Sequence, residues 1–118
     1  MKVYAFDVDE TLEVSGGPIP IADVMSLVWV DGHIAGLCGN WAVVTLRVPN
    51  WHRLFSFLGP HLTGKAEYLV QMKAYVPADE HIMVGNILGV SGASDDKGAA
   101  EVAGWRFIKE SDFAGGSR

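Results

Sequence analysis

The sequence has only one cysteine, Cys38, among its 118 residues, so no disulfide can form within the chain. It also lacks an excess of positive charge, since its formal net charge is −5, and this disfavours a broad nucleic-acid surface. No segment approaches the ~20 apolar residues of a membrane span. The chain enters a strand-like pattern directly, so we expect no signal peptide. These absences predict a soluble, cytoplasmic protein with neither a membrane nor a nucleic acid as partner.

The composition is that of one compact domain. Hydrophobic residues make up 49% of the chain and charged residues 19%, which is ordinary for a globular protein and unlike a disordered one. A chain of this length buries roughly 60–70% of its unfolded surface, which is enough for one core. We therefore expect a single domain over residues 1–113, followed by a frayed, disordered tail at 114–118.

Strand-like and helix-like patterns alternate along the chain. Strands are predicted at Lys2–Phe6, His33–Cys38, Pro60–Thr63, His81–Val84 and Trp105–Ile108. Helices are predicted at Ile21–Val30, Trp41–Leu58 with a break or kink at Pro49, Lys65–Tyr75, and Asp95–Ala103 with Ser94 or Asp95 as the N-cap. Loops are expected at Glu13–Pro20 and Asn86–Ser94.

This alternation predicts an α/β fold, in which helices cover both faces of a mainly parallel, Rossmann-like sheet of about five strands. The result is a three-layer sandwich. Ligands of such sheets bind beyond the carboxyl ends of the strands. Polar residues stand at these ends, namely Asp7 and Asp9, Gly39-Asn40, Lys65 and Gly85-Asn86. The sequence therefore places a candidate site at this edge of the sheet.

Asp7 and Asp9 form an unfavourable pair unless something separates their charges. Side chains two residues apart in an extended segment point to the same side, and like charges that close raise each other's pKa unless a cation lies between them. Lys65 and the acidic Asp95-Asp96 are expected on the same rim. Together these groups fit a phosphoryl group and Mg²⁺, which prefers oxygen ligands. The simpler interpretation is that Asp7 and Asp9 form a turn and cap, and that Asp95-Asp96 favours a helix N-terminus.

The chain resembles the haloacid dehalogenase superfamily, whose commonest members are Mg²⁺-dependent phosphatases. The resemblance covers most of the chain. It rests on Asp7-Val8-Asp9-Glu10-Thr11 after an apolar strand, on the segment from Gly32 to Asn40, on Lys65 at the start of a helix, and on Val84-Gly85-Asn86 followed by Asp95-Asp96 and Ala103-Gly104. It implies a small member without a cap domain and a strand order of 5-4-1-2-3.

The resemblance also implies roles for the first motif. Asp7 would be the nucleophile and a metal ligand. Asp9 would be the general acid and base, and its backbone carbonyl would be a metal ligand. Thr11 would help to shape the first loop.

Two further roles follow from the resemblance. Lys65 would hold the phosphoryl group, while Lys73 lies too far along the same helix to reach the rim easily. Asp96 would be the metal-binding acid, with Asp95 a close second.

Two positions depart from the family pattern. Gly39 stands where the family usually presents Ser or Thr to the phosphate, so its backbone N–H or the side-chain amide of Asn40 would have to donate instead. Thr45 is the other candidate hydroxyl, but we expect it inside a helix. Asn86 replaces an acid, which removes a negative charge from the metal site and predicts weaker metal binding.

The leading prediction is a Mg²⁺-dependent phosphate monoester hydrolase that acts through an aspartyl-phosphate on Asp7. The alternative is a binding or regulatory module with weak or lost catalysis, which Gly39 and Asn86 suggest. A phosphoacceptor receiver domain would need its Asp at the end of a middle strand, where none occurs. A hydrolytic dehalogenase fits less well, because Asp9 serves phosphoryl leaving groups better than halide.

The segment between Thr11 and the second strand is too short for an inserted cap domain. Little would then cover the site. Two hypotheses follow: either the phosphorylated substrate is a macromolecule large enough to close the site itself, or a neighbour in a homo-oligomer serves as the lid.

Overall fold

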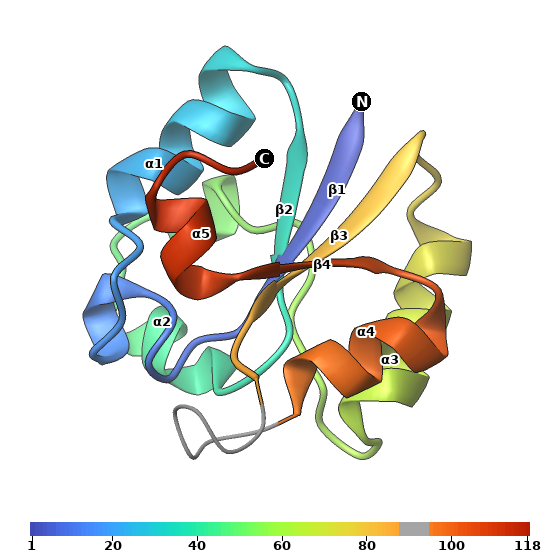
Figure 1. Cartoon of the computed structure of the whole chain (residues 1–118). Coiled ribbons are helices and arrows are strands. Elements are labelled where there is room, and N and C mark those ends of the chain that lie inside the picture. Colours follow the sequence, from blue (N-terminus) through green and yellow to red (C-terminus); the bar gives the residue numbers. More distant parts are fainter. Residues whose placement is uncertain (88–94) are drawn as a thin grey trace.

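The computed structural model describes residues 1–87 and 95–118. Its centre is a parallel sheet in the order β2-β1-β3-β4 (Figure 1). The strands of the described residues are β1 (Lys2–Phe6), β2 (Ile34–Leu37), β3 (Glu80–Gly85) and β4 (Arg106–Lys109). This confirms the predicted α/β fold with a parallel sheet, and these strands lie in the predicted order.

The helices are mostly short. They are α1 (Ile21–Met25), α2 (Trp41–Arg47), α3 (Lys65–Tyr75), α4 (Asp96–Ala103) and α5 (Glu110–Ala114), with a π-helical segment at Ser26–Val30 and 3₁₀ turns at Glu13–Ser15 and Trp51–Arg53. The prediction for α3 is confirmed at both ends. The long helix predicted over Trp41–Leu58 is wrong, because α2 ends at Arg47, shortly before Pro49.

Helices pack on both faces of the sheet (Figure 1). Alternate residues of β1 point to opposite faces. Tyr4 and Phe6 join the cluster that includes Val24 of α1, Val44 of α2 and Phe113 of α5.

On the opposite face, Val3 and Ala5 of β1 join a second cluster. That cluster includes Leu69 of α3 and Ala100 of α4. The sheet is therefore buried on both sides, as is usual for parallel strands.

The third strand predicted at Pro60–Thr63 is wrong, since residues 60–63 form no strand. The segment before them runs parallel to β2 instead: Ser56 N–H donates to Ala35 O at 2.8 Å, and Leu37 N–H donates to Phe57 O at 2.9 Å. The ring of Phe57 fills the space beside Gly36, where an added Cβ would lie 2.2 Å from a ring carbon.

The C-terminal residues contact the body of the domain. We expect the tail at 114–118 to be frayed, but the Arg118 guanidinium lies 3.9 Å from the centre of the Phe113 ring, and Arg106 donates to Arg118 O at 2.9 Å. The loop predicted at Asn86–Ser94, with Ser94 as a possible cap, falls largely outside the described residues. Among the helices that are described, none has the length and apolarity to cross a membrane.

Candidate active site

The site is built at the carboxyl end of β1. The ladder to β3 continues one residue past the strand, because Asp7 N–H donates to Val84 O at 2.9 Å. The chain then turns, and Val8 O accepts Thr11 N–H at 3.1 Å. Glu10, in the middle of this turn, has a left-handed φ of 57°, a conformation that is strained for residues with a Cβ and that clusters at functional sites.

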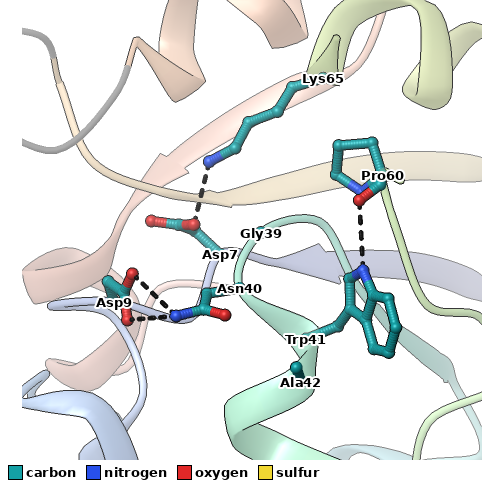
Figure 2. Close-up of a pocket in the computed structure, with 8 residues that line it drawn as sticks. All are labelled: Asp7, Asp9, Gly39, Asn40, Trp41, Ala42, Pro60 and Lys65. Atoms are coloured by element: carbon teal, nitrogen blue, oxygen red, sulfur yellow. Dashed lines mark hydrogen bonds and ion pairs between the residues drawn. The ribbon is translucent and has the colours of Figure 1, made fainter. Parts of the chain in front are cut away.

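Asp7 is buried and has a partner on each carboxylate oxygen. Only 3% of the residue is exposed. Oδ1 lies 3.0 Å from Lys65 Nζ (Figure 2), and Oδ2 accepts from Asn86 Nδ2 at 3.0 Å and from Thr11 Oγ1 at 3.4 Å. These contacts fix the orientation of the carboxylate toward the strand ends of β1 and β3.

Lys65 joins two buried carboxylates. It is the first residue of α3, and its Nζ lies 2.7 Å from Asp96 Oδ1 as well as 3.0 Å from Asp7 Oδ1. Asp96 is fully buried at the start of α4, and its Oδ2 accepts Asn86 N–H at 2.8 Å. The predicted convergence of the first motif, the lysine and the acidic cluster is therefore present in the structure.

Asp95 and Asp96 play different parts. Asp95 is exposed and is the N-cap of α4, because its Oδ1 accepts Gly98 N–H at 2.9 Å. Asp96 points into the cluster instead. The structure thus brings Asp96 to Asp7 and Lys65, and uses Asp95 to begin the helix.

The charges in this cluster shift one another's ionisation. Burial raises the pKa of Asp7 to about 6, an effect that the Lys65 ammonium opposes and the Asp96 carboxylate reinforces. Burial disfavours the ammonium of Lys65, but the two carboxylates outweigh this and raise the pKa of Lys65. Near neutral pH, Lys65 is therefore a cation, and Asp7 is mostly ionised but binds a proton more readily than an exposed carboxylate does.

Asp9 lies in the same pocket but in a more open position. Its Oδ1 accepts from Ser15 Oγ at 2.5 Å, and its two oxygens lie 3.5 and 3.4 Å from Asn40 Nδ2 (Figure 2). Its main-chain carbonyl accepts from Asn86 Nδ2 at 3.2 Å. An acid that faces the pocket and is held by two polar partners is suited to proton transfer.

The pocket itself has a volume of about 520 Å³. It is lined by Asp7, Asp9, Gly39, Asn40, Trp41, Ala42, Pro60 and Lys65 (Figure 2). Five of the predicted site residues thus surround one cavity, whose size is within the range of small-molecule sites.

Gly39 does not have the predicted role of a backbone donor. Its N–H donates to Gly59 O at 2.9 Å, so it is already used within the fold. Thr45 does not replace it, because its hydroxyl donates to Ala42 O at 2.9 Å within α2. The side-chain amide of Asn40 faces Asp9. Lys65 and Asn40 are lining residues whose side-chain nitrogens lie beside the pocket's acids, Asp7 and Asp9 respectively.

The oxygen atoms around Asn86 fit a hard cation. Asn86 Nδ2 contacts both Asp7 Oδ2 and the carbonyl of Asp9, while Asn86 Oδ1 is buried and has no hydrogen-bond partner among the described residues. Amide oxygen and nitrogen exchange places when the side chain turns over. A turned Asn86 would bring three oxygens together. No three His, Cys, Asp or Glu side chains of the described residues form such a group by themselves.

Some contacts of the site have no signal in the sequence. Ser15, at the end of the 3₁₀ turn Glu13–Ser15, contacts Asp9. Trp41 and Pro60 are far apart in the chain, yet they meet at the pocket. The sequence marks Asn86 as a departure from a pattern, but it does not predict the hydrogen bonds of Asn86 to Asp7 and Asp9.

Comparisons of the chain with known protein families, with curated proteins and with solved structures found no match.

Proposed function

We propose that the protein is a Mg²⁺-dependent phosphate monoester hydrolase of the haloacid dehalogenase type, with Asp7 as the nucleophile. The observation that carries the proposal is the position of Lys65 Nζ between Asp7 and Asp96, at the wall of a pocket that Asp9 also lines. A nucleophilic carboxylate, a fixed cation and a second acid are the groups that phosphoryl transfer requires.

In the first half of the reaction, Asp7 Oδ1 attacks phosphorus and the bond from phosphorus to the ester oxygen breaks. Protonated Asp9 gives its proton to the departing oxygen, so the product leaves as an alcohol. Lys65, 3.0 Å from Asp7 Oδ1, balances the negative charge of the phosphoryl oxygens.

In the second half, water attacks the phosphorus of the aspartyl-phosphate. Asp9, now a carboxylate, accepts a proton from that water, and the bond between phosphorus and Asp7 breaks. Inorganic phosphate leaves, and the Asp7 carboxylate and protonated Asp9 are restored. Asn40 and Ser15 orient Asp9 for both transfers.

The residues that would hold Mg²⁺ are Asp7, the carbonyl of Asp9, Asp96 and the amide oxygen of Asn86. When bound, the ion supplies positive charge that stabilises the phosphoryl oxygens. Because Asn86 is neutral, this set has one negative charge fewer than three acids would give, so weak binding of Mg²⁺ is expected.

The test is hydrolysis of a generic aryl phosphate with and without Mg²⁺, followed by acid quenching to trap the phosphorylated protein. We expect turnover that needs Mg²⁺ and a phosphoryl adduct on Asp7, both lost in Asp7→Asn. Asp31→Asn, at an exposed residue, is the matched control. Full activity of Asp7→Asn would reject the mechanism.

A second candidate is a binding or regulatory module of the same fold. It is favoured by the engaged N–H of Gly39, which gives the phosphate one donor fewer, and by the neutral Asn86, which gives the metal site one negative charge fewer. This candidate predicts that inorganic phosphate or Mg²⁺ binds in calorimetry while a broad panel of phosphate esters is not hydrolysed. Efficient turnover of any ester at this site would exclude it.

A further inference from the structure

One wall of the pocket takes no part in the proposed hydrolysis. Trp41, Ala42 and Pro60 line it, whereas Asp9 lies on the other side of the Asp7–Lys65 pair (Figure 2). The pocket is therefore polar where phosphoryl transfer would occur and apolar beside it. Its volume of about 520 Å³ leaves room for a leaving group as well as a phosphoryl group.

The indole of Trp41 is held in place. Its Nε1 donates to Pro60 O at 3.2 Å (Figure 2). The ring is partly buried against the hydrophobic cluster that includes Phe6 and Val44. A ring that is already ordered loses little conformational freedom when a ligand packs against it. Trp41 thus provides a prepared aromatic surface in the pocket.

This surface begins close to the reacting carboxylate. A Cβ added to Gly39 would lie 2.3 Å from Asp7 Oδ1, and Trp41 follows Gly39 by two residues, which span at most ~7 Å. The turn is tighter than that limit, since Trp41 N–H donates to Gly39 O at 2.7 Å. A group attached to the phosphoryl oxygen therefore comes within reach of the indole.

We propose, resting on the function proposed above, that Trp41 determines specificity by packing against a flat ring in the leaving group. The substrates are then phosphate monoesters in which the ester oxygen is on an aromatic ring or one carbon from it. Aromatic rings prefer offset or edge-to-face contacts with one another, and a saturated ring cannot make them.

The experiment compares benzyl phosphate with cyclohexylmethyl phosphate in the presence of Mg²⁺. Both release a primary alcohol, so they differ in the flatness of the ring and little in the reactivity of the ester. We expect a KM about three- to tenfold lower for benzyl phosphate, with similar kcat. Trp41→Leu should bring the KM ratio to about one and Trp41→Phe should keep most of it. The control Trp29→Leu should not change it, because Trp29 is exposed and lines a different pocket.

A wild-type KM ratio near one, with both esters hydrolysed, overturns the role of Trp41 and leaves the hydrolase standing. The non-hydrolysable benzylphosphonate and cyclohexylmethylphosphonate separate the two proposals further, by calorimetric binding. Tighter binding of benzylphosphonate that is lost in Trp41→Leu supports the aromatic subsite even if no ester turns over, in which case only the hydrolase fails. Equal binding of the two phosphonates overturns the subsite. Should Trp41→Leu not fold, as judged by circular dichroism, the wild-type ratio and Trp41→Phe decide.

Discussion

Gly39 and the carboxylate of Asp7 occupy adjoining space with no room for a side chain between them. A Cβ built on Gly39 would lie 2.3 Å from Asp7 Oδ1 and 3.1 Å from the backbone nitrogen of Val8. Real Cβ atoms do not approach oxygen so closely, so any larger residue at 39 must displace Asp7. Because position 39 has no side chain, the Asp7 carboxylate can occupy this space and turn toward Lys65.

Introducing a hydroxyl at this position by Gly39→Ser should reduce activity. The closest atom is the movable end of Asp7, so the carboxylate would rotate away from Lys65. We expect kcat/KM to fall about 100-fold from this misplacement. The free energy of unfolding should fall by only about 1–3 kcal/mol. Enzyme kinetics and urea denaturation measure the two effects.

The matched control is Gly64→Ser. Nothing lies within 4 Å of a Cβ at Gly64, and Gly64 is the N-cap of α3, a position that Ser favours. Stability should be equal or slightly higher, with activity retained. If Gly39→Ser were more active than the wild type, activity would not depend on the space that Gly39 leaves for the Asp7 carboxylate.

Asn86→Asp replaces the neutral amide by a carboxylate. It should make the metal-free protein less stable and make Mg²⁺ bind more tightly. A carboxylate at 86 would face Asp7 Oδ2 and the Asp9 carbonyl, which now accept hydrogen bonds from the amide. Without metal we expect the free energy of unfolding to fall by about 1–3 kcal/mol. With Mg²⁺ the loss should be reversed, because the cation separates the like charges.

Thermal denaturation with EDTA and with Mg²⁺ measures this exchange. Asn50→Asp adds the same charge at an exposed residue and should respond to neither. Equal melting temperatures for Asn86→Asp and the wild type in EDTA would show that the hydrogen bonds from Asn86 to Asp7 Oδ2 and the Asp9 carbonyl do not stabilise the metal-free protein.

Local patterns predict which residues meet at this edge of the sheet. An apolar run followed by Asp7 predicts the end of β1, and apolar spacing bounded by Pro77 predicts α3 from Lys65 to Tyr75. Because parallel strands end at one edge, these two elements and Asp96 at the start of α4 must converge there. The contacts of Lys65 with Asp7 and Asp96 follow from that topology.

The remaining features depend on contacts between distant parts of the chain. The Pro60–Thr63 strand is predicted from local composition, but the segment that pairs with β2 is selected by Phe57 filling the space beside Gly36. Two further hydrogen bonds depend on this same pairing: the Gly39 N–H donates to Gly59 O, and Trp41 Nε1 donates to Pro60 O. Local periodicity contains no information on any of them.

The buried carboxylate of Asp7 predicts a pH dependence of stability. Burial raises its pKa to about 6, so between about pH 4 and pH 6 the folded protein keeps a proton that the unfolded chain releases. Stability from this residue is complete at low pH and is lost as the pH rises through 6. Asp7→Asn lacks this loss, so it should gain up to ~3 kcal/mol over the wild type between pH 4 and pH 7.

Urea denaturation in EDTA at several pH values measures the free energy of unfolding of Asp7→Asn and of the wild type as a function of pH. Asp31→Asn, at an exposed carboxylate, should run parallel to the wild type across the range. A constant difference between Asp7→Asn and the wild type at all pH values would contradict the raised pKa of Asp7.

Two lysines of α3 should behave very differently. Lys65→Met leaves Asp7 and Asp96 buried without their common cation, which should lower the free energy of unfolding by about 3 kcal/mol at pH 7 and abolish turnover. The loss should be smaller at pH 5, where Asp7 is protonated. Lys73→Met removes an exposed contact to Gly104 O and should change stability by no more than about 0.5 kcal/mol. Comparable losses in both variants would argue against a special position for Lys65.

The adjacent acids Asp95 and Asp96 provide the most closely matched pair of variants in the chain. Asp96→Asn removes a charge that lies 2.7 Å from Lys65 Nζ and should weaken Mg²⁺ binding about tenfold or more. Asp95→Asn keeps the cap on Gly98 N–H, because Asn is as good an N-cap as Asp, and should leave Mg²⁺ binding nearly unchanged. Both variants alter the formal charge equally and lie one residue apart, so long-range electrostatics cannot account for a difference between them. Calorimetric titration with Mg²⁺ measures it, and weaker binding in Asp95→Asn than in Asp96→Asn would reverse the assignment of the two acids.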